Sequence, residues 1–408
     1  MDTTYDAIVV GARCAGSPTA MLLARRGYRV LLVDKATFPS DTISTLIIHP
    51  PGVARLERWG LLERLVATGC PPIERYSYDF GPFAISGSPR PTDGISVAFG
   101  PRRTVLDALL VESAGAAGAD VEEGFAVDEL LVENGRVTGI KGRRRGAGSV
   151  NVRARVVIGA DGRTSRVARI VRPHEYNTKP PLQCGYYTFW SGLPVDGFEV
   201  FVRHRRGGGA IPTHDGLTLV VAGWPIAELQ ENRRDVEGAY LGALELVPDL
   251  AERMRGARRQ APFVGTHVAS YFRKPYGPGW ALVGDAGYDK DPVTAWGISD
   301  AFRDAELCAS ALDEWLSGVR DFDGALAGYQ RVRDEQSMAL YELTCGFATL
   351  ERPPVEMQEL LAAVHGHQEE MDAFVSMMAG TLPIPEFLDP ANVARMMAAN
   401  GELETVSG

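Results

Sequence analysis

Three apolar runs that lie far apart in the chain each stop at a corner of small residues. They are AIVVGARCAG at 7–16, VVIGADG at 156–162 and ALVGDAG at 281–287, and the second and third corners carry an aspartate. Continuous apolar runs are typical of parallel strands buried on both faces, and ligands bind where such strands end. Three corners spread over most of the chain therefore predict one nucleotide site assembled from distant segments.

The first corner matches two of the three glycines of the dinucleotide-binding fingerprint. Gly11 and Gly16 fill the first and third positions, Arg13 occupies the middle one, and Ala12 and Ala15 complete the turn. A side chain in the middle blocks the closest backbone approach to a pyrophosphate, but the helix N-terminus still offers N–H groups and a partial positive charge. Arg13 either adds a cation to this site or points to solvent, and the sequence leaves both open.

A carboxylate follows the second predicted strand. Asp34 ends the run Tyr28–Val33, where a carboxylate can accept both hydroxyls of an adenosine ribose. The alternative is a surface acid beside Lys35. The position favours the ribose role, so we assign Asp34 and Lys35 to the nucleotide site.

Bulk properties exclude several classes of protein. The chain has 408 residues, which suits two or three structural units, and its net charge of −10 argues against a nucleic-acid partner. The five cysteines form no metal-binding spacing, so we expect no metal and a reducing, cytoplasmic location. The start MDTTYDAIVV lacks a signal-peptide pattern, and no apolar run approaches the roughly 20 residues that span a bilayer, so we expect no stable membrane association.

Hydrophobic periodicity predicts an α/β protein. Residues 5–34 are typical of a β-α-β unit, strand-like runs within 175–275 indicate an antiparallel sheet, and the pattern from 297 onward is almost entirely helical. We therefore expect a Rossmann-like domain with an inserted, mostly antiparallel β-sheet domain and a helical C-terminal region. The predicted boundaries are 1–75, 101–170 and 276–320 for the cofactor domain, 76–100 and 171–275 for the substrate-binding sheet domain, and 321–408 for the helical region.

Over roughly residues 1–310 the chain resembles the FAD-dependent oxidoreductases of the p-hydroxybenzoate hydroxylase type, a superfamily that includes aromatic hydroxylases and geranylgeranyl reductases. These motifs indicate the superfamily and leave the substrate open. The resemblance is carried by Gly11, Gly16 and Asp34; by Arg103, Leu106 and Leu110; by Asp161, Gly162 and Ser165; and by Gly284, Asp285, Ala286, Pro292, Gly297 and Asp300.

The resemblance implies FAD as cofactor, with NADPH or NADH as reductant. Arg103 would begin a helix beneath FAD and reach its diphosphate or ribityl chain. Asp161 and Gly162 would turn close to FAD, and in the family this aspartate also lies near the route of NAD(P)H. At the third corner, Gly284 and Asp285 would meet a ribityl hydroxyl.

The same resemblance places a helix N-terminus at the flavin. Gly297 and Ile298 would point N–H groups at the pyrimidine edge, where a reduced flavin gathers negative charge. Two departures leave the oxygenase subclass open. The segment Ala295-Trp296-Gly297 replaces a Gly-Gln-Gly type of segment, so that Trp296 is expected to wall off one side of the ring, and Tyr288 replaces a histidine.

Substrate and proton-transfer candidates are aromatic residues and histidines. We expect Tyr187, Trp224, Pro292 and Trp296 to contact substrate, although packing is an alternative for each aromatic residue. His49 follows a loop that by family position passes near the flavin, and it is the candidate for proton transfer. A second histidine, His214, and a purely structural role for both also stay open.

The implied activity is that of an NAD(P)H-dependent FAD monooxygenase. It would use molecular oxygen, through a flavin C4a-hydroperoxide, to hydroxylate or epoxidise a small aromatic or polyketide-like substrate. The alternative is a flavin-dependent reductase of isoprenoid double bonds, which WGISDAFRDAELCA partly resembles. A halogenase is disfavoured because the chain has no WxWxIP segment and no lysine between Lys35 and Lys141.

The alternative to an enzyme is a carrier or assembly factor that keeps FAD as a structural element, and the three intact cofactor corners argue against it. We expect a monomer or homodimer. The helices beyond 320 could cap the cofactor domain or form the dimer contact, and the sequence does not choose between these.

Overall fold

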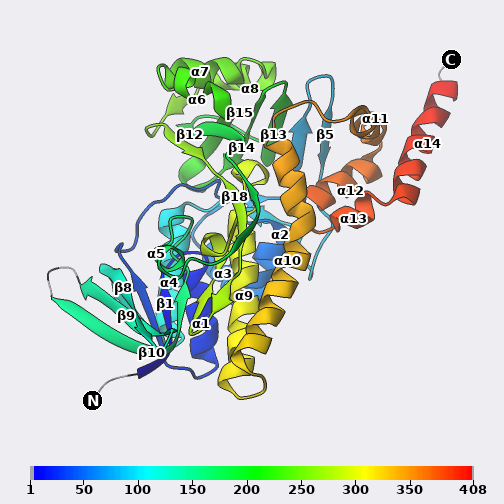
Figure 1. Ribbon diagram of the computed structural model, residues 1–408. Coiled ribbons are helices and arrows are strands. Elements are labelled where there is room, and N and C mark those ends of the chain that lie inside the picture. The colour runs from blue at the N-terminus through cyan, green and yellow to red at the C-terminus, as the bar shows by residue number, and fades with distance from the viewer. Residues whose placement is uncertain (1–3, 145, 147, 407–408) are drawn as a thin grey trace.

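The computed structural model describes residues 4–144, 146 and 148–406. Its lower domain in Figure 1 contains a parallel sheet in the order β7-β2-β1-β10-β20, with β19 antiparallel at the edge. Strand β1 lies in the middle because its apolar residues are buried on both faces: Ala7 and Val9 enter one core, and Ile8 and Val10 the other. The strands are β1 (Thr4–Val10), β2 (Val30–Asp34), β7 (Asp120–Glu123), β10 (Ser149–Gly159), β19 (Tyr276–Gly277) and β20 (Trp280–Leu282).

Helices cover one face of this sheet, and a strand pair covers the other. Helix α1 packs against α4 and α9, while β8 and β9 continue antiparallel from β10. The elements are α1 (Gly16–Arg25), α2 (Pro50–Arg58), α3 (Leu62–Val66), α4 (Arg103–Ala116), α5 (Arg166–Val171), α9 (Gly297–Leu316), β8 (Phe125–Glu133) and β9 (Arg136–Arg144).

A second sheet forms the upper domain, in the order β16-β12-β15-β14-β13-β4-β5, with β17 also paired to β12. Its pairs are antiparallel except that of β13 with β4. The strands are β4 (Tyr76–Asp79), β5 (Ala84–Gly87), β12 (Gln183–Ser191), β13 (Phe198–Arg203), β14 (Arg206–Pro212), β15 (Leu217–Pro225), β16 (Arg258–Arg259) and β17 (Val264–His267).

Three short helices pack on the second sheet, on the face that carries Trp224. Helices α6–α8 between β15 and β16 were not predicted, because we interpreted 175–275 as strands and loops; Tyr240, Ala243 and Leu244 give α7 a buried face against the sheet. The remaining elements are α6 (Leu229–Asn232), α7 (Val236–Leu244), α8 (Pro248–Met254), β3 (Pro72–Ile73), β6 (Ala98–Phe99), β11 (Glu175–Lys179), β18 (Ser270–Arg273), β21 (Tyr288–Asp289), and the 3-10 turns η1 (His214–Gly216), η2 (Ile226–Glu228), η3 (Gly284–Ala286) and η4 (Pro292–Thr294).

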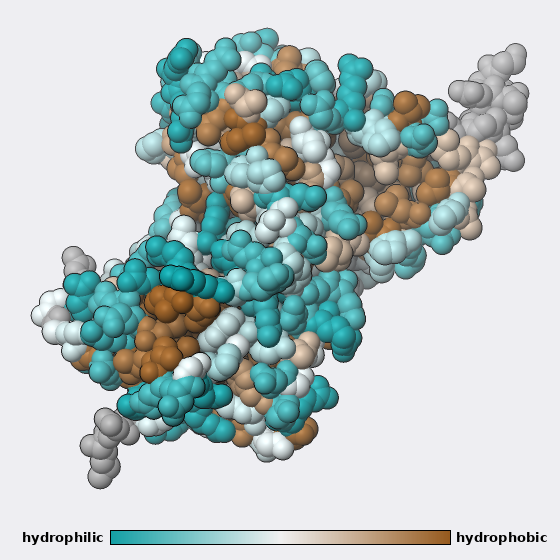
Figure 2. Space-filling view, in the orientation of Figure 1, coloured by the Kyte–Doolittle hydropathy of each residue, from teal (hydrophilic) through white to brown (hydrophobic). Residues whose placement is uncertain are grey.

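The C-terminal helices cap the second sheet. Helix α10 leaves the lower domain beside α9 and runs up to this sheet (Figure 1), where Phe374, Met378 and Leu361 pack in one core with Tyr78 and Phe198. Hydrophobic residues gather on the surface over these helices (Figure 2). The helices are α10 (Phe322–Phe347), α11 (Val355–Val364), α12 (Gln368–Ala379), α13 (Ile384–Phe387) and α14 (Pro390–Val406).

The architecture confirms the predicted α/β class with an antiparallel sheet domain and C-terminal helices. In the described part of the chain, no helix combines the length and the apolar character that a bilayer crossing requires.

Candidate active site

The three corners meet at one cavity of about 1200 Å³. It begins at Gly11 and Asp34, passes Asp161 and Asp285, and ends between the second sheet and the C-terminal helices at Phe374. Small-molecule pockets usually measure about 300–1,000 Å³. The cavity therefore has room for a cofactor and a second ligand together.

Glycine is required at both ends of the first corner. Gly11 has a φ of 106°, and a Cβ there would lie 2.4 Å from the carbonyl oxygen of Ala160. A Cβ on Gly16 would lie 1.7 Å from the carbonyl oxygen of Gly11. Helix α1 begins at Gly16, and within the described residues no side chain caps it. The N–H of Ser17 donates to the carbonyl of Arg13 and Pro18 has no N–H, so within the described residues the N–H groups left for an anion are those of Ala15, in the cavity wall, and of Gly16.

Arg13 points into the protein, not to solvent. Its Nη1 lies 2.5 Å from Oδ2 of Asp107, and Nε and Nη2 of Arg103 bond the same carboxylate at 2.9–3.1 Å. Cys14 donates its S–H to Asp107, and burial raises the pKa of this thiol, which marks it as a packing residue. Two guanidinium groups share one carboxylate, which leaves positive charge at the cavity wall that suits a diphosphate.

Sequence reasoning missed Asp107, although its spacing of four residues from Arg103 on one helix was a usable signal.

Asp34 is fixed at the end of β2 by two backbone donors. Its Oδ2 accepts from the N–H of Ala12 at 2.7 Å, and its Oδ1 accepts from the N–H of Ala36 at 2.8 Å. Each oxygen keeps a further lone pair toward the cavity that Asp34 and Lys35 line, which fits a ribose diol. Ala12 thus acts through its backbone, since its side chain is buried outside the cavity.

Ser165 caps helix α5, and the carboxylate of Asp161 holds this cap and the first N–H of the helix. The Oδ1 of Asp161 accepts from the hydroxyl of Ser165 at 2.5 Å and its Oδ2 from the N–H of Arg166 at 2.6 Å. Gly162 follows with a φ of 74°, and both residues line the cavity. Because the carboxylate of Asp161 is already hydrogen-bonded within the protein, a ligand here would contact mainly the backbone of the turn.

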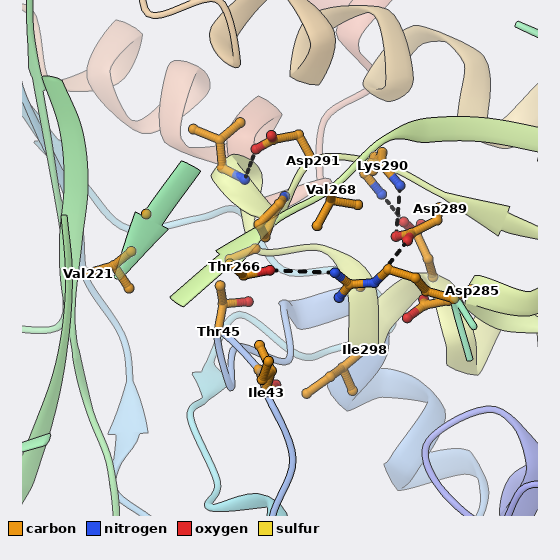
Figure 3. A pocket seen from close by; sticks show the side chains of 18 of the residues that line it. Ile43, Thr45, Val221, Thr266, Val268, Asp285, Asp289, Lys290, Asp291 and Ile298 are labelled. Carbon is orange, nitrogen blue, oxygen red and sulfur yellow. Dashed lines mark hydrogen bonds and ion pairs between the residues drawn. The ribbon is translucent and has the colours of Figure 1, made fainter. Parts of the chain in front are cut away.

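The third corner packs directly on the first. A Cβ on Gly284 would lie 2.8 Å from the Cβ of Ala15. Within the described residues no protein donor hydrogen-bonds the carboxylate of Asp285, which lines the cavity (Figure 3). Burial raises the pKa of Asp285, while Arg163 and Arg103 counteract this rise. A carboxylate that lacks a protein donor is free to accept a ligand hydroxyl.

Two further acids lie beside Asp285. Asp289 has a buried Oδ2 without a hydrogen bond; its nearest cation is Nε of Arg163 at 3.4 Å (Figure 3). Asp291 accepts from Nε2 of Gln183 at 2.5 Å, and burial raises its pKa to about 6. Neither acid was predicted as a site residue, although GYDKDP places both directly after the third corner.

Helix α9 begins at the cavity. Gly297 and Ile298 line it, and in the described chain no side chain caps this helix. Its N–H groups and dipole therefore face a ligand. Pro292, in the preceding η4 turn, also lines the cavity, and Ala295 turns the chain between them with a φ of 58°.

His49 and Trp296 lie outside the cavity lining. The Nε2 of His49 lies 3.2 Å from the carbonyl oxygen of Thr294 and its Nδ1 lies 3.0 Å from the hydroxyl of Tyr76. Burial lowers the pKa of His49 to about 4, so the ring is neutral near pH 7. Trp296 stacks on it at 4.7 Å and donates its N–H to the carbonyl of Met378. Both rings hold the loop before α9, and neither reaches a substrate.

Trp224 is fully buried on the opposite face of the second sheet, stacked on Tyr186. The expected contact of Trp224 with the substrate is therefore wrong, whereas Tyr187 lines the cavity. His214 is buried as well: its Nδ1 accepts from the N–H of Arg102 and its Nε2 lies 2.8 Å from the hydroxyl of Thr68. Burial lowers the pKa of His214, and its bonds assign it a structural role.

A family model described as an FAD binding domain matches residues 4–344. The chain belongs to this family. It is therefore an FAD-dependent oxidoreductase. The first corner, the guanidinium groups of Arg13 and Arg103, and Asp34 fit a dinucleotide, which agrees with FAD as the cofactor.

Similar proteins carry out different reactions. A digeranylgeranylglycerophospholipid reductase of Methanocella arvoryzae is 27% identical over 338 residues, which covers 76% of this chain and 78% of the relative. A 6-methylpretetramide 4-monooxygenase of Streptomyces rimosus is 25% identical over 341 residues, covering 76% of each chain. The structure of the flavin-dependent brominase Bmp2 shares the fold with a TM-score of 0.82 at 18% identity, covering 99% of this chain and 100% of that chain. Membership of the family thus leaves the reaction open.

Proposed function

We propose that the protein is an FAD-dependent monooxygenase that uses NAD(P)H and O₂ to hydroxylate or epoxidise an aromatic or polyketide-like molecule. One observation carries the proposal: the cavity that starts at the cofactor corners continues into an apolar chamber between the second sheet and helices α10–α13. Bound FAD, once reduced, supplies activated oxygen, and a chamber that excludes water reserves this oxygen for the substrate.

The residues around the cavity would bind different parts of FAD and of the substrate. Arg13 and Arg103 would hold the diphosphate, Asp34 the adenosine ribose and Asp285 the ribityl chain. The start of α9 would stabilise negative charge on the flavin pyrimidine edge. Tyr187 and Pro292, from opposite sides of the chamber, would contact the substrate.

Reduction of an isoprenoid and halogenation are the two alternative reactions. The reductase relative supports saturation of an isoprenoid double bond, since an apolar chamber also suits such a chain. Halogenation is less well supported, because a halogenase places a lysine between flavin and substrate. Among the described residues, the lysines that line the cavity are Lys35, at the ribose end, and Lys290, which is ion-paired with Asp300.

The test is a screen of aromatic compounds for those that accelerate NADPH oxidation by the FAD-loaded protein. A monooxygenase consumes one O₂ for each NADPH and yields an oxygenated product. Oxidation of NADPH that proceeds without oxygen and reduces an isoprenoid would overturn the proposal in favour of the reductase.

A further inference from the structure

The loop between the third corner and helix α9 places two buried acids on the cavity wall. Asp289 and Asp291 both line the cavity, with exposed fractions of 9% and 3% (Figure 3). Lys290 lies between them in the sequence, but its ammonium is ion-paired with Asp300 on α9. The nearest lysine in the chain is therefore already committed to another carboxylate.

The ion pairs on α9 balance among themselves. Arg303 is ion-paired with both Asp300 and Asp304, and Lys290 adds a second cation to Asp300. Two cations thus meet two carboxylates, and this group leaves no excess of positive charge for the cavity wall.

Three carboxylates remain on the wall, those of Asp285, Asp289 and Asp291. Among the described residues, Arg163 is the one cation that forms an ion pair with any of them, through its Nε at 3.4 Å from Oδ2 of Asp289. A buried charge is costly unless it is paired. This part of the cavity is therefore short of positive charge.

The surroundings of Asp289 show the same shortage. Its Oδ2 is buried without a hydrogen bond, and Arg163 directs Nη1 at the hydroxyl of Thr266, 3.4 Å away (Figure 3). Burial and the neighbouring Asp285 raise the pKa of Asp289. A cation bound nearby would offset both effects.

The carboxylate of Asp291 is held in place by neutral donors. Its Oδ1 accepts from Nε2 of Gln183 at 2.5 Å and from the N–H of Val293 at 3.0 Å. Within the described residues, Oδ2 has no donor and the carboxylate has no ion pair. One oxygen of this buried acid is thus left for a ligand.

We propose that Asp291, supported by Asp289, binds the protonated amine of a substrate whose remaining part is apolar. An ammonium group supplies both the missing charge and a donor for Oδ2. Pro292 and Val293 follow Asp291 directly on the wall, which continues to Phe374 in the apolar chamber. In the described part of the chain no group of three or more His, Cys, Asp or Glu side chains is placed to hold a metal ion, which favours an organic cation.

This assignment deepens the proposed function and rests on it for the order of cofactor and substrate along the cavity. Binding to the FAD-loaded protein, without NADPH, tests it in the absence of turnover. The probes are three para-substituted phenols of similar length that differ in charge: tyramine, 4-propylphenol and 3-(4-hydroxyphenyl)propanoate. Quenching of flavin fluorescence or calorimetry at pH 7.5 gives each Kd. In the wild type we expect tyramine to bind most tightly and the propanoate most weakly.

Asp291→Asn keeps the shape of the side chain and removes its charge. It should weaken tyramine binding about thirtyfold, as expected for loss of one partner of a buried charge pair, and change 4-propylphenol binding less than about twofold. Asp289→Asn should weaken tyramine binding less, by about threefold, because Arg163 already offsets part of its charge. It serves as the second variant if Asp291→Asn does not fold. Asp196→Asn, at a side chain that is 88% exposed, is the control and should match the wild type.

A pH titration separates a charge effect from a change of shape. Burial raises the pKa of Asp291 to about 6, with Arg163 acting against this rise. The thiol of Cys345 on α10 also faces Asp291, and burial raises its pKa, so it stays neutral. From pH 7.5 to pH 5.5, Asp291 takes up a proton and tyramine should bind about fourfold more weakly. Asp291→Asn should lose this dependence, and 4-propylphenol should not show it.

Equal affinity of the wild type for tyramine and 4-propylphenol, or an unchanged tyramine Kd in folded Asp291→Asn, would overturn the amine site. Loss of yellow colour from folded Asp291→Asn would instead assign this residue to FAD and overturn it as well. If tyramine binds selectively but no aromatic compound accelerates NADPH oxidation, the amine site stands and the monooxygenase proposal fails. If only neutral aromatic compounds bind and are oxygenated, the reverse holds.

Discussion

At the scale of single residues, the hydrogen-bond and ion-pair partners of each carboxylate determine whether it can bind a ligand. Asp107 is ion-paired with Arg13 and Arg103, and Asp161 accepts from the hydroxyl of Ser165 and the N–H of Arg166 at the start of α5. Asp34 is held in place by two backbone donors. Among these acids, Asp285 is the one that, within the described residues, has no protein donor. This contrast makes Asp285 the acid most directly dependent on a ligand.

Replacement of Asp285 should therefore affect cofactor retention. We expect purified Asp285→Ala to be colourless or nearly so, measured as the ratio of flavin to protein absorbance. The matched control is Asp196→Ala, whose side chain is 88% exposed beside Arg75 and which should stay yellow. A fully yellow Asp285→Ala protein would remove this residue from the cofactor site.

His49 should influence stability and leave proton transfer unchanged. Its pKa falls from 6.5 to about 4 on folding because it is buried. As the pH drops below about 6.5, His49 becomes protonated in the unfolded chain but stays neutral in the folded protein. Stability is therefore lost between about pH 6.5 and pH 4.

From pH 7.5 to pH 5, the wild type should lose about 2 kcal/mol more unfolding free energy than His49→Gln, which keeps a donor for the Thr294 carbonyl. Urea unfolding at both pH values measures this difference. An equal pH dependence of the two proteins would contradict the assignment, and a changed pH profile of kcat would restore His49 as a catalytic candidate.

At the scale of elements, the turn between β1 and α1 is the most sharply constrained part of the site. The absence of a Cβ lets Gly11 approach Ala160 at the end of β10, lets Gly16 approach the carbonyl of Gly11, and lets Gly284 of η3 pack on Ala15. The close contact of Gly284 with Ala15 places the residue before α1 and Asp285 in the wall of one cavity. Loss of a single glycine should then damage both folding and cofactor binding.

Gly16→Ala tests this constraint. We expect a loss of about 2 kcal/mol or more in unfolding free energy, since the new Cβ overlaps a backbone oxygen, together with release of FAD. Thermal unfolding and flavin absorbance report the two effects. Gly115→Ala in α4, where the nearest atom to a Cβ would be 3.7 Å away, is the control and should be neutral or stabilising. Retention of stability and colour by Gly16→Ala would contradict this account of the turn.

At the scale of the whole molecule, the C-terminal helices complete the chamber. Phe374, Met377 and Leu361 line the cavity opposite Tyr78 and belong to the same hydrophobic core as the second sheet. The cofactor domain alone would leave this sheet face open to water. The helical region thus contributes directly to the proposed chemistry, which depends on water exclusion.

Phe374→Ala should let water enter the chamber. We expect about 3 kcal/mol of lost stability from the cavity left behind, and a larger share of NADPH electrons released as hydrogen peroxide when an accelerating aromatic is present. Peroxide formed per NADPH consumed is the measurement. Val319→Ala, at a 77% exposed position, should match the wild type. An unchanged peroxide yield in folded Phe374→Ala would show that this wall does not protect the reaction.

The amino-acid sequence by itself determined the α/β class with its antiparallel sheet domain and C-terminal helices. It also pointed to the three corners, because a tight turn, a strand end or a helix start depends on a few adjacent residues. Gly11, Gly16 and Gly284 are required by backbone contacts of that kind. Helices α6–α8 escaped prediction because they are short and sit between strong strand patterns.

Only the tertiary structure decided which way the larger side chains point. Arg13 turns inward because Asp107, distant in sequence, offers a buried partner, and Trp296 leaves the cavity because Met378 and His49 hold it elsewhere. Contacts of this kind join residues far apart in the chain, and no local pattern records them.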